Sequence, residues 1–403
     1  MNIIFLSATC ARTDYDAICQ KRKYPLLDSS QKFFEMFLHG LQQQPQVTVD
    51  CITVRPLSHG TYPGLYIPPA HTTEGNLRYH YVPILNLPVI KTVCAALSVR
   101  RYLKRLLRQY RGQDTHILCD PLLLDGLLPA VALGKRYGVP VTGFLTDMPD
   151  YADAFDGHGG IKDRLYRLYN RLSNYGMERL DGHVVLTEAM ACIAKEKPWM
   201  LLDCIVDETM LEGIQPLPNE DPRPRVLYAG KLHREFGLDL LEQAIPLVQR
   251  DCVFHIYGDG NHADALRELA RREPRLQLHG IVPLPTVLAA ELGADLLINP
   301  RTGAGEFTKY SFPSKTAEYM LAGVPVVMFH LPGIAKEYAD YIPFAKEETP
   351  AAFAAAIDRM LDRPTEERQA MGQRAKDYIR ANKNCKKQAA RVVAFLNDYR
   401  KRG

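Results

Sequence analysis

The stretch YSFPSKTAEYMLAGVPVV, residues 310–327, predicts a helix followed directly by a strand. Pro313 suits the first helical position, where no N–H is needed and its fixed φ is already helical, with Phe312 or Ser311 before it as the cap. Gly323 suits the position just after the last helical turn, and VPVV begins the next strand. A helix feeding straight into a strand in this way is typical of α/β folds.

The same alternation of apolar strands and helical stretches runs along the whole chain, which predicts parallel sheets with helical crossovers. In the first half the strand candidates are NIIFLSA, VTVDCITV, LRYHYVPIL, HILCDP, VPVTGFLT and GHVVLT. Helices are expected in DSSQKFFEMFLHGL, opened by Asp28 and Ser29 as caps, and in GIKDRLYRLYNRLSNYGMERL. In the second half the strands are RVLYAG, CVFHIYG, LQLHGI, DLLINP and VPVVMF. Helices there start at Leu238, at Ala263, near Thr286 and at Pro313.

A chain of 403 residues fits two domains of ordinary size. The proline-rich and charged stretch GIQPLPNEDPRPR, 213–225, has the composition of a linker. We therefore expect an N-terminal Rossmann-like domain over 1–212 and a second Rossmann-like domain over 226–380. The helix over 381–403 is expected to pack back on the first domain. Two doubly wound sheets of this kind are expected to face a central cleft.

Composition narrows the function classes. The chain is 46% hydrophobic and 24% charged, with a net charge of +4, which is too weak a bias to indicate a nucleic-acid partner. Its nine cysteines have no CxxC pair, which favours free thiols in a reducing cytoplasm. The N-terminal apolar run lacks a basic flank and favours a first strand over a signal peptide. We expect a cytoplasmic protein whose membrane contact, if any, is peripheral at the inner face.

Two glycine-containing loops follow strands of the second half. AGKLHREFG places Gly230, Lys231 and His233 at the carboxyl end of one strand, and GDGNHADAL places Gly258 and Gly260 at the end of the next. Exposed backbone N–H groups beside cations favour phosphate binding. A turn with solvated basic residues, or a plain strand-to-helix turn, fits each loop taken alone.

The helix start near Pro313 is the third such feature. Its free N–H groups, Ser314 and Lys315 would converge on an anion, helped by about +0.5 charge from the helix dipole. Glu318 falls one turn deeper. The alternative is an exposed Lys315–Glu318 pair worth about 0.2–0.5 kcal/mol to the helix.

Taken together, AGKLHREFG, FTKYSFPSKT, the helix with Glu318, and LPGIAKEY at 331–338 resemble the nucleotide-sugar site of family 4 glycosyltransferases of the GT-B fold. The match is greatest with the branch that builds bacterial surface polysaccharides. The resemblance implies transfer from a UDP- or GDP-linked sugar to a saccharide, expected to be lipid-linked, with retention. No cofactor is expected, and no metal, because no Asp-x-Asp motif lies in a suitable loop. The donor contacts it assigns are Gly230, Lys231, Gly258, Val282, Arg301, Phe312, Ser314, Lys315 and Glu318.

Two positions depart from that family's pattern. The first acid of its Glu-x7-Glu motif falls at Tyr310, while the second is present as Glu318. The lysine of its K-G loop falls at Phe236, and we expect Lys315 to replace that cation. The sugar contact then falls to Tyr310 or to Glu306.

In the first half, Asp147 follows the strand that the resemblance places opposite the transferred sugar. A carboxylate there would orient a sugar hydroxyl or the acceptor. The alternative is a turn-forming Asp before Met148 and Pro149. The residues we expect to carry catalysis are Asp147, Lys231, Lys315 and Tyr310.

The segment 90–112 predicts a basic amphipathic helix. It interleaves Arg100, Arg101, Lys104, Arg105, Arg108 and Arg111 with Leu97, Tyr102, Leu103, Leu106, Leu107 and Tyr110. Such a helix suits an anionic membrane surface, and equally the solvated basic face of a core helix. No aromatic platform for RNA accompanies it, so no nucleic acid is expected.

Other function classes stay open. A GT-B nucleotide-sugar epimerase would share this fold and consume donor without an acceptor. A non-catalytic saccharide-binding protein would fit the missing first acid. A nicotinamide enzyme is disfavoured, because no G-x-G-x-x-G follows the first strand.

Overall fold

The computed structural model describes residues 1–21, 29–57, 60, 62–88, 90–148 and 161–400. Contacts divide the chain into two compact units, one of residues 1–205 with 385–403 and one of residues 206–384. The predicted cap Asp28 lies outside the described residues. Each unit is an α/β layer structure built on a mainly parallel sheet, which confirms the predicted fold class.

The first unit is built on a sheet ordered β10-β9-β8-β7-β1-β2-β5-β4. Its strands are β1 (Asn2–Ser7), β2 (Thr48–Thr53), β4 (Ala70–Glu74), β5 (Leu77–Tyr81), β7 (Thr115–Cys119), β8 (Val141–Leu145), β9 (Gly182–Val185) and β10 (Trp199–Leu201). All pairs are parallel except β4 with β5, which form a hairpin at the edge. A separate ribbon pairs β3 (Tyr66–Ile67) with β6 (Ile84–Leu85). Sequence periodicity missed β3, β4 and β10 because they are short, mostly exposed, or both.

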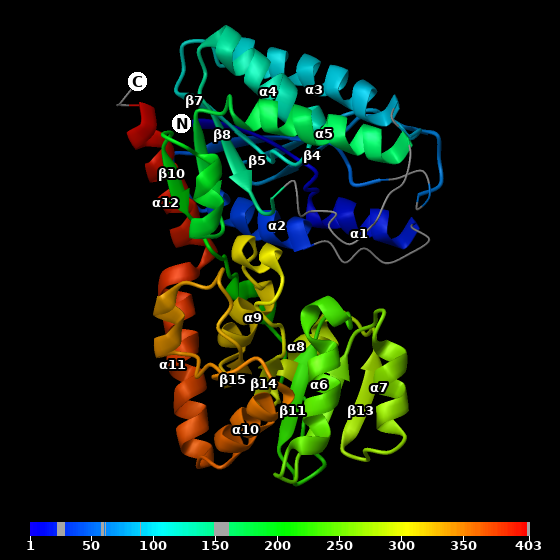
Figure 1. Ribbon diagram of the computed structural model, residues 1–403. Coiled ribbons are helices and arrows are strands. Elements are labelled where there is room, and N and C mark those ends of the chain that lie inside the picture. The colour runs from blue at the N-terminus through cyan, green and yellow to red at the C-terminus, as the bar shows by residue number, and fades with distance from the viewer. Residues whose placement is uncertain (22–28, 58–59, 61, 89, 149–160, 401–403) are drawn as a thin grey trace. The chain divides into compact units, whose positions relative to one another are not determined.

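Helices cover both faces of this sheet (Figure 1). On one side α3 (Ile90–Gln109), α4 (Leu124–Tyr137) and α5 (Ile161–Met177) lie side by side. On the other lie α2 (Ser29–Gln42) and α12 (Cys385–Arg400), and α1 (Arg12–Lys21) precedes α2 in the chain. The 3-10 helix η1 (Glu188–Ile193) follows β9.

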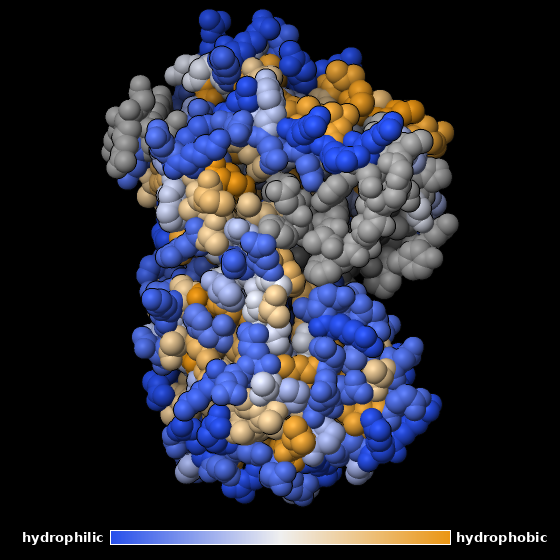
Figure 2. Space-filling model, in the orientation of Figure 1, coloured by the Kyte–Doolittle hydropathy of each residue, from blue (hydrophilic) through white to orange (hydrophobic). Residues whose placement is uncertain are grey.

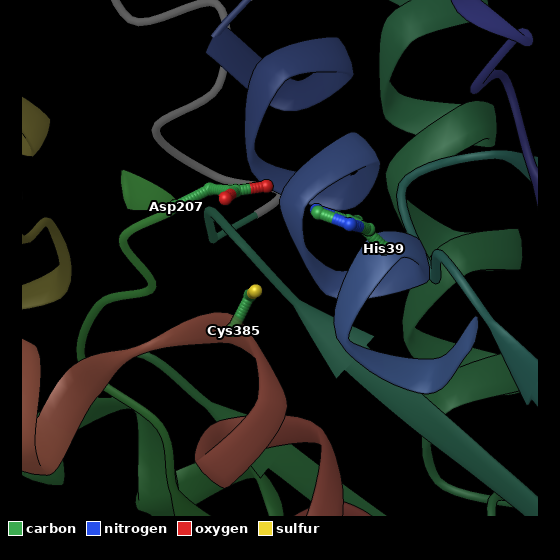
Figure 3. A group of neighbouring side chains, drawn as sticks. All are labelled: His39, Asp207 and Cys385. Carbon is green, nitrogen blue, oxygen red and sulfur yellow. The ribbon is translucent and has the colours of Figure 1, made fainter. Parts of the chain in front are cut away.

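The packing of α12 on α2 is close. A side chain at Gly40 would place its Cβ 2.1 Å from the carbonyl oxygen of Cys385, so only glycine fits there. Gln43 Nε2 donates to Cys385 Sγ over 3.8 Å. Figure 3 shows Cys385 at the start of α12 and His39 on the neighbouring α2. The other labelled residue, Asp207, belongs to the second unit and caps a short helix there.

The second unit has the strand order β13-β12-β11-β14-β15, all parallel. The strands are β11 (Arg225–Ala229), β12 (Val253–Tyr257), β13 (Leu276–Gly280), β14 (Leu296–Asn299) and β15 (Val326–Met328). The order reverses between β11 and β14, and ligands of such sheets bind outside the carboxyl ends of the strands at this switch point.

The helices of this unit pack in two groups. They are α6 (Leu238–Ala244), α7 (Ala263–Ala270) and α10 (Pro350–Leu361) in one, and α8 (Leu284–Leu292), α9 (Ser314–Ala322) and α11 (Thr365–Lys383) in the other. Short 3-10 helices are η2 (Glu208–Leu211), η3 (Arg234–Phe236), η4 (Ile245–Leu247), η5 (Glu306–Tyr310) and η6 (Lys336–Asp340). No described helix has the length and apolar character that crossing a bilayer requires.

The helix within 310–327 starts one residue later than predicted. Pro313 has extended backbone angles, φ −70° and ψ 109°, and is the N-cap, so α9 begins at Ser314. Gly323 ends the helix in the left-handed conformation with φ 78°, as predicted.

Candidate functional site

The loops after β11 and β12 are held against each other by their backbones. Gly258 has φ +129°, and a Cβ there would lie 1.8 Å from the carbonyl oxygen of Gly230. A Cβ on Gly260 would lie 2.5 Å from the carbonyl oxygen of Leu232. The N–H of Leu232 donates to the carbonyl of Asp259 at 3.0 Å. Glycine is therefore required at 258 and 260 by close backbone approach.

Lys231 lies at the tip of the first of these loops. Its side chain is exposed, and the hydroxyl of Tyr228 fixes its backbone by donating to the Lys231 carbonyl at 3.0 Å. Within the described part of the chain, no carboxylate forms an ion pair with Lys231. A full positive charge is thus presented at the carboxyl end of β11.

Arg301 brings a second cation to the neighbouring strand end. It follows β14, is only 7% exposed, and its guanidinium lies between two aromatic rings, 5.4 Å from the centroid of Phe236 and 5.1 Å from that of Phe307. Gly237 allows this contact, because a Cβ there would lie 2.1 Å from the Pro300 carbonyl oxygen. The sequence pattern leaves Phe236 where a lysine was expected, and the structure puts Arg301 over its ring.

The start of α9 is tied to the end of β11. The hydroxyl of Tyr319 accepts a hydrogen bond from the backbone N–H of Ala229 at 3.0 Å. One turn earlier, Lys315 Nζ lies 2.8 Å from Glu318 Oε2 and 3.2 Å from Glu291 Oε1. Glu291, on α8, is 1% exposed. Lys315 is therefore neutralised by two carboxylates rather than presented as a bare cation.

The electrostatics of these groups are coupled. Burial alone would lower the pKa of Lys315, but the adjacent carboxylates of Glu318 and Glu291 outweigh it and hold the pKa well above its ordinary value. Burial raises the pKa of the Tyr228 hydroxyl, and the positive charges of Lys315 and Arg301 both oppose that rise. Both cations are thus close enough to act on the residue that also fixes Lys231.

The remaining predicted residues of this unit lie around the same loops or next to them. Ser314 is exposed at the first turn of α9, whereas Phe312 is buried, 5.5 Å from the ring of Tyr338. Tyr310 ends η5 and is half-buried, and Val282 is half-buried in the loop after β13.

Glu306 and Asp147 are both exposed, and Asp147 lies in the other unit. Glu306 forms a 3.8 Å ion pair with Lys309 at the surface. Asp147 belongs to the first unit, where it is exposed just after β8.

Sequence reasoning missed Glu291, Phe307 and Tyr319. Glu291 carried a usable signal, because an acid inside the apolar stretch VLAAEL needs a buried partner. The aromatic rings carried none, since ordinary core packing explains them equally well.

Comparison with known proteins bears on this unit directly. Residues 223–363 match the protein-family model described as Glycosyl transferases group 1. The matched residues lie within the second unit, which carries the cations and glycine loops described above. A search of curated proteins gave no match to this sequence.

Solved structures show that the likeness in fold extends over the whole chain. Sucrose-phosphate synthase from Thermosynechococcus elongatus is similar at 15% identity and a TM-score of 0.66, with 100% of each chain covered. The lipopolysaccharide outer core galactosyltransferase WaaB is similar at 12% identity and a TM-score of 0.63, with 99% of each chain covered. The Anabaena protein HepE in complex with UDP is similar at 12% identity and a TM-score of 0.62, with 99% of this chain and 100% of that one covered. The fold is GT-B, and the findings support a nucleotide-sugar glycosyltransferase.

Proposed function

We propose that this group 1 glycosyltransferase binds the diphosphate of a nucleoside-diphosphate sugar at the switch point between β11 and β14. The observation that carries the proposal is the pair of cations at adjacent strand ends, Lys231 after β11 and Arg301 after β14. Glycine at 230 and 258 lets the two loops approach closely at the same edge, while the N–H groups of these two glycines donate to the carbonyls of Tyr257 and Gly280. A dianionic leaving group needs this combination of charge and close backbone approach.

The chemistry asked of these residues is stabilisation of the departing diphosphate. Negative charge grows on it as the glycosidic carbon takes on oxocarbenium character, and fixed cations at that point lower the barrier. Arg301 suits this role because its planar guanidinium offers paired donors to phosphate and is held by packing. Lys231 adds an exposed, movable charge.

The Lys315–Glu318 pair has a different role in this proposal. Glu318 carries the carboxylate that accepts hydrogen bonds from the ribose hydroxyls, and Lys315 orients it from 2.8 Å. Ser314, exposed in the first turn of α9, and Phe312, two residues before it, complete the proposed donor contacts at this helix start. Tyr310 stands where the related enzymes have an acid, and we propose that it contacts the transferred sugar, with Val282 beside the base.

The stereochemistry, the acceptor and the nucleotide of the donor are also part of this proposal. We propose family 4 chemistry with retention, a saccharide acceptor held by the first unit with help from Asp147, and a place in surface-polysaccharide synthesis. The solved relatives favour UDP over GDP as the first nucleotide to test, because HepE was solved with UDP. WaaB, a lipopolysaccharide galactosyltransferase by its title, makes a saccharide acceptor the first choice. Donor binding is proposed to need no metal ion, so a chelator should leave transfer unchanged.

A lipid-linked acceptor would bring the chain to a membrane, and α3 offers a contact surface. Of the apolar residues predicted for it, Leu103, Leu106, Leu107 and Tyr110 are buried, Tyr102 is half-buried and Leu97 is exposed. Leu65, Tyr66, Ile90 and Val93 are further exposed apolar residues of this region. In Figure 2 hydrophobic side chains gather at the upper right, over the N-terminal part of α3 in Figure 1.

The chain around α3 is strongly basic. Between Glu74 and Asp114 the chain has no acidic residue, while Arg100, Arg101, Arg105 and other cations of α3 are exposed. Exposed apolar side chains followed by uncompensated cations suit an anionic bilayer surface, with about 1 kcal/mol for each cation near it. We propose peripheral attachment through this part of the first unit, at the cytoplasmic face.

The donor proposal is tested by the thermal unfolding of the purified chain with UDP, GDP, ADP or TDP at millimolar concentration. Binding to the folded state raises the unfolding temperature by mass action, so one nucleotide should give a rise that the others do not. Product analysis with the matching sugar nucleotide then separates the classes. Transfer to a saccharide supports the proposal, consumption of donor alone indicates an epimerase, and no shift with any nucleotide would contradict donor binding.

A further inference from the structure

Two histidine side chains face each other on the edge hairpin of the first unit. His71 on β4 is the direct cross-strand partner of His80 on β5. Their Nδ1 atoms are 3.1 Å apart, and their rings meet edge to face at 81°. His71 is exposed, whereas the side chain of His80 is 19% exposed. The pair therefore points its ring nitrogens at one spot that solvent reaches.

A buried carboxylate holds the inner ring in place. Asp50, on β2, has a side chain that is 2% exposed, and its Oδ1 lies 2.7 Å from His80 Nε2. Arg78 donates to both of its oxygens at 2.9 and 2.8 Å, and Tyr110 donates to Oδ2 at 2.5 Å. Burial by itself would raise the pKa of Asp50, but these hydrogen bonds outweigh it and lower the pKa.

The protonation of the pair follows from this network. Because Asp50 is ionised and can only accept, Nε2 of His80 must carry the hydrogen that lies between them. The tautomer that fits this contact has its lone pair on Nδ1, which faces His71. His71 faces this atom with its own Nδ1, 3.1 Å away.

We propose that His71 and His80 bind a divalent transition-metal ion, with Zn²⁺ as the reference case, through their two Nδ1 atoms. Zinc–imidazole bonds of about 2.0–2.1 Å at a tetrahedral angle put two ligand nitrogens about 3.3 Å apart, close to the spacing of this pair. A small rotation of the exposed His71 ring would let its lone pair meet the lone pair of His80 at one ion, while the His80 ring stays in place. Histidine ligands commonly donate their other N–H to a carboxylate, the arrangement that Asp50 makes with His80.

The charges around the pair set its strength. The positive charge of Arg78 is met by Asp50 in a two-point contact, so it does not oppose a dication in full. The positive charge of Arg105, on α3, acts on His71 and opposes the binding of a cation. No ion pair among the described residues gives Arg105 a carboxylate partner. With two protein ligands and water in the other positions, binding is weaker and more exchangeable than at a four-ligand structural site. The ion would link the edge strand β4 to β5 and stabilise the first unit when bound.

A second histidine pair supplies a matched control. His255 Nδ1 and His279 Nε2, on β12 and β13, are 3.0 Å apart, but their rings are stacked at 8°. Among the described residues neither ring is hydrogen-bonded to a carboxylate. The two pairs share a nitrogen–nitrogen distance and differ in the carboxylate support that the proposal requires.

The experiment is calorimetric titration of ZnCl₂ into the full chain after treatment with a chelator. The variants are His71→Ala, at an exposed position where the fold should survive, His80→Gln, and His255→Gln as the control. Circular dichroism of each variant checks folding. Asp50→Asn, which removes the charge behind His80, should weaken binding about 10- to 100-fold if it folds. Arg105→Gln should strengthen it.

The expected result is one Zn²⁺ fewer per chain in the His71 and His80 variants, with the His255 variant like the wild type. Zinc should also raise the unfolding temperature of the wild type more than that of the His71 variant. Undiminished stoichiometry in His71→Ala, or a loss confined to His255→Gln, would overturn the assignment. These readouts do not involve sugar transfer, so they stand or fall separately from the proposed function.

Discussion

The guanidinium of Arg301 lies 5.4 Å from the ring centroid of Phe236, at the carboxyl end of β14. Position 236 is where the resemblance to family 4 enzymes leads us to expect a lysine, and on sequence grounds the donor site is one cation short without it. The aromatic ring instead supports a cation that comes from the next strand. An aromatic side chain at 236 thus positions an arginine at 301.

Replacement of Arg301 by Ala should reduce kcat for sugar transfer about 100-fold or more, because a fixed charge on the leaving group would be lost. Arg301→Lys should recover only part of this, since an ammonium neither stacks between Phe236 and Phe307 nor offers paired donors. Steady-state kinetics with the preferred donor measure both. Arg271→Ala, which removes an exposed arginine on the surface of the same unit, should leave kcat unchanged. Equal turnover in the Arg301 and Arg271 variants would remove Arg301 from the site.

Replacement of Lys315 by Ala should destabilise the fold as well as impair transfer. On sequence grounds we would expect only activity to suffer, because a helix start at the edge of a sheet tolerates truncation. The buried Glu291 changes that expectation, since loss of its cation costs about 3 kcal/mol of unfolding free energy for a pair of this burial. Urea unfolding of the chain measures it.

A double variant separates the two effects of Lys315. Lys315→Met with Glu291→Leu replaces the buried pair by apolar side chains and should recover much of the lost stability. Affinity for the nucleoside diphosphate should stay low. Recovery of affinity together with stability would show that Lys315 acts only on the fold.

Glu318→Gln should weaken binding of the free nucleoside diphosphate about 10-fold, because the ribose hydroxyls would lose a charged acceptor. The amide keeps the size of the side chain and so limits the structural change near Lys315. Calorimetry with the preferred nucleotide and with its 2′,3′-dideoxy analogue tests the role. If the variant discriminates between the two as strongly as the wild type does, Glu318 does not meet the ribose.

Acid should destabilise the first unit through His183. Its side chain is fully buried on β9, and burial lowers its pKa to about 4 from an ordinary 6.5. A histidine with a depressed pKa in the folded state favours folding above the pKa of the unfolded chain, and this contribution is lost as the pH falls from about 6.5 toward 4. The loss amounts to roughly 3 kcal/mol. In His183→Gln, urea unfolding measured from pH 7 to 4 should show a shallower decline, and an unchanged slope would contradict the assignment.

Attachment to anionic bilayers should depend on the apolar residues that open α3. Val93→Glu with Leu97→Glu should abolish co-sedimentation with vesicles containing anionic lipid, because charge would replace exposed apolar side chains. Leu247→Glu, at an exposed apolar position of the other unit, is the control. Binding of the wild type should fall as salt rises. Equal sedimentation of both variants, or none by the wild type, would argue against this surface.

The sequence by itself determined the α/β class, the chain order of the major strands, and the glycines at 230, 258 and 323, because periodicity and backbone freedom are local properties. It also pointed to Lys231, Lys315 and Glu318. Only the tertiary structure decided what surrounds them. Glu291 neutralises Lys315 from a different helix, and Phe236 meets Arg301 across 65 positions of the chain. Buried charges and ring contacts depend on side chains distant in sequence, and a local pattern does not encode which of them meet.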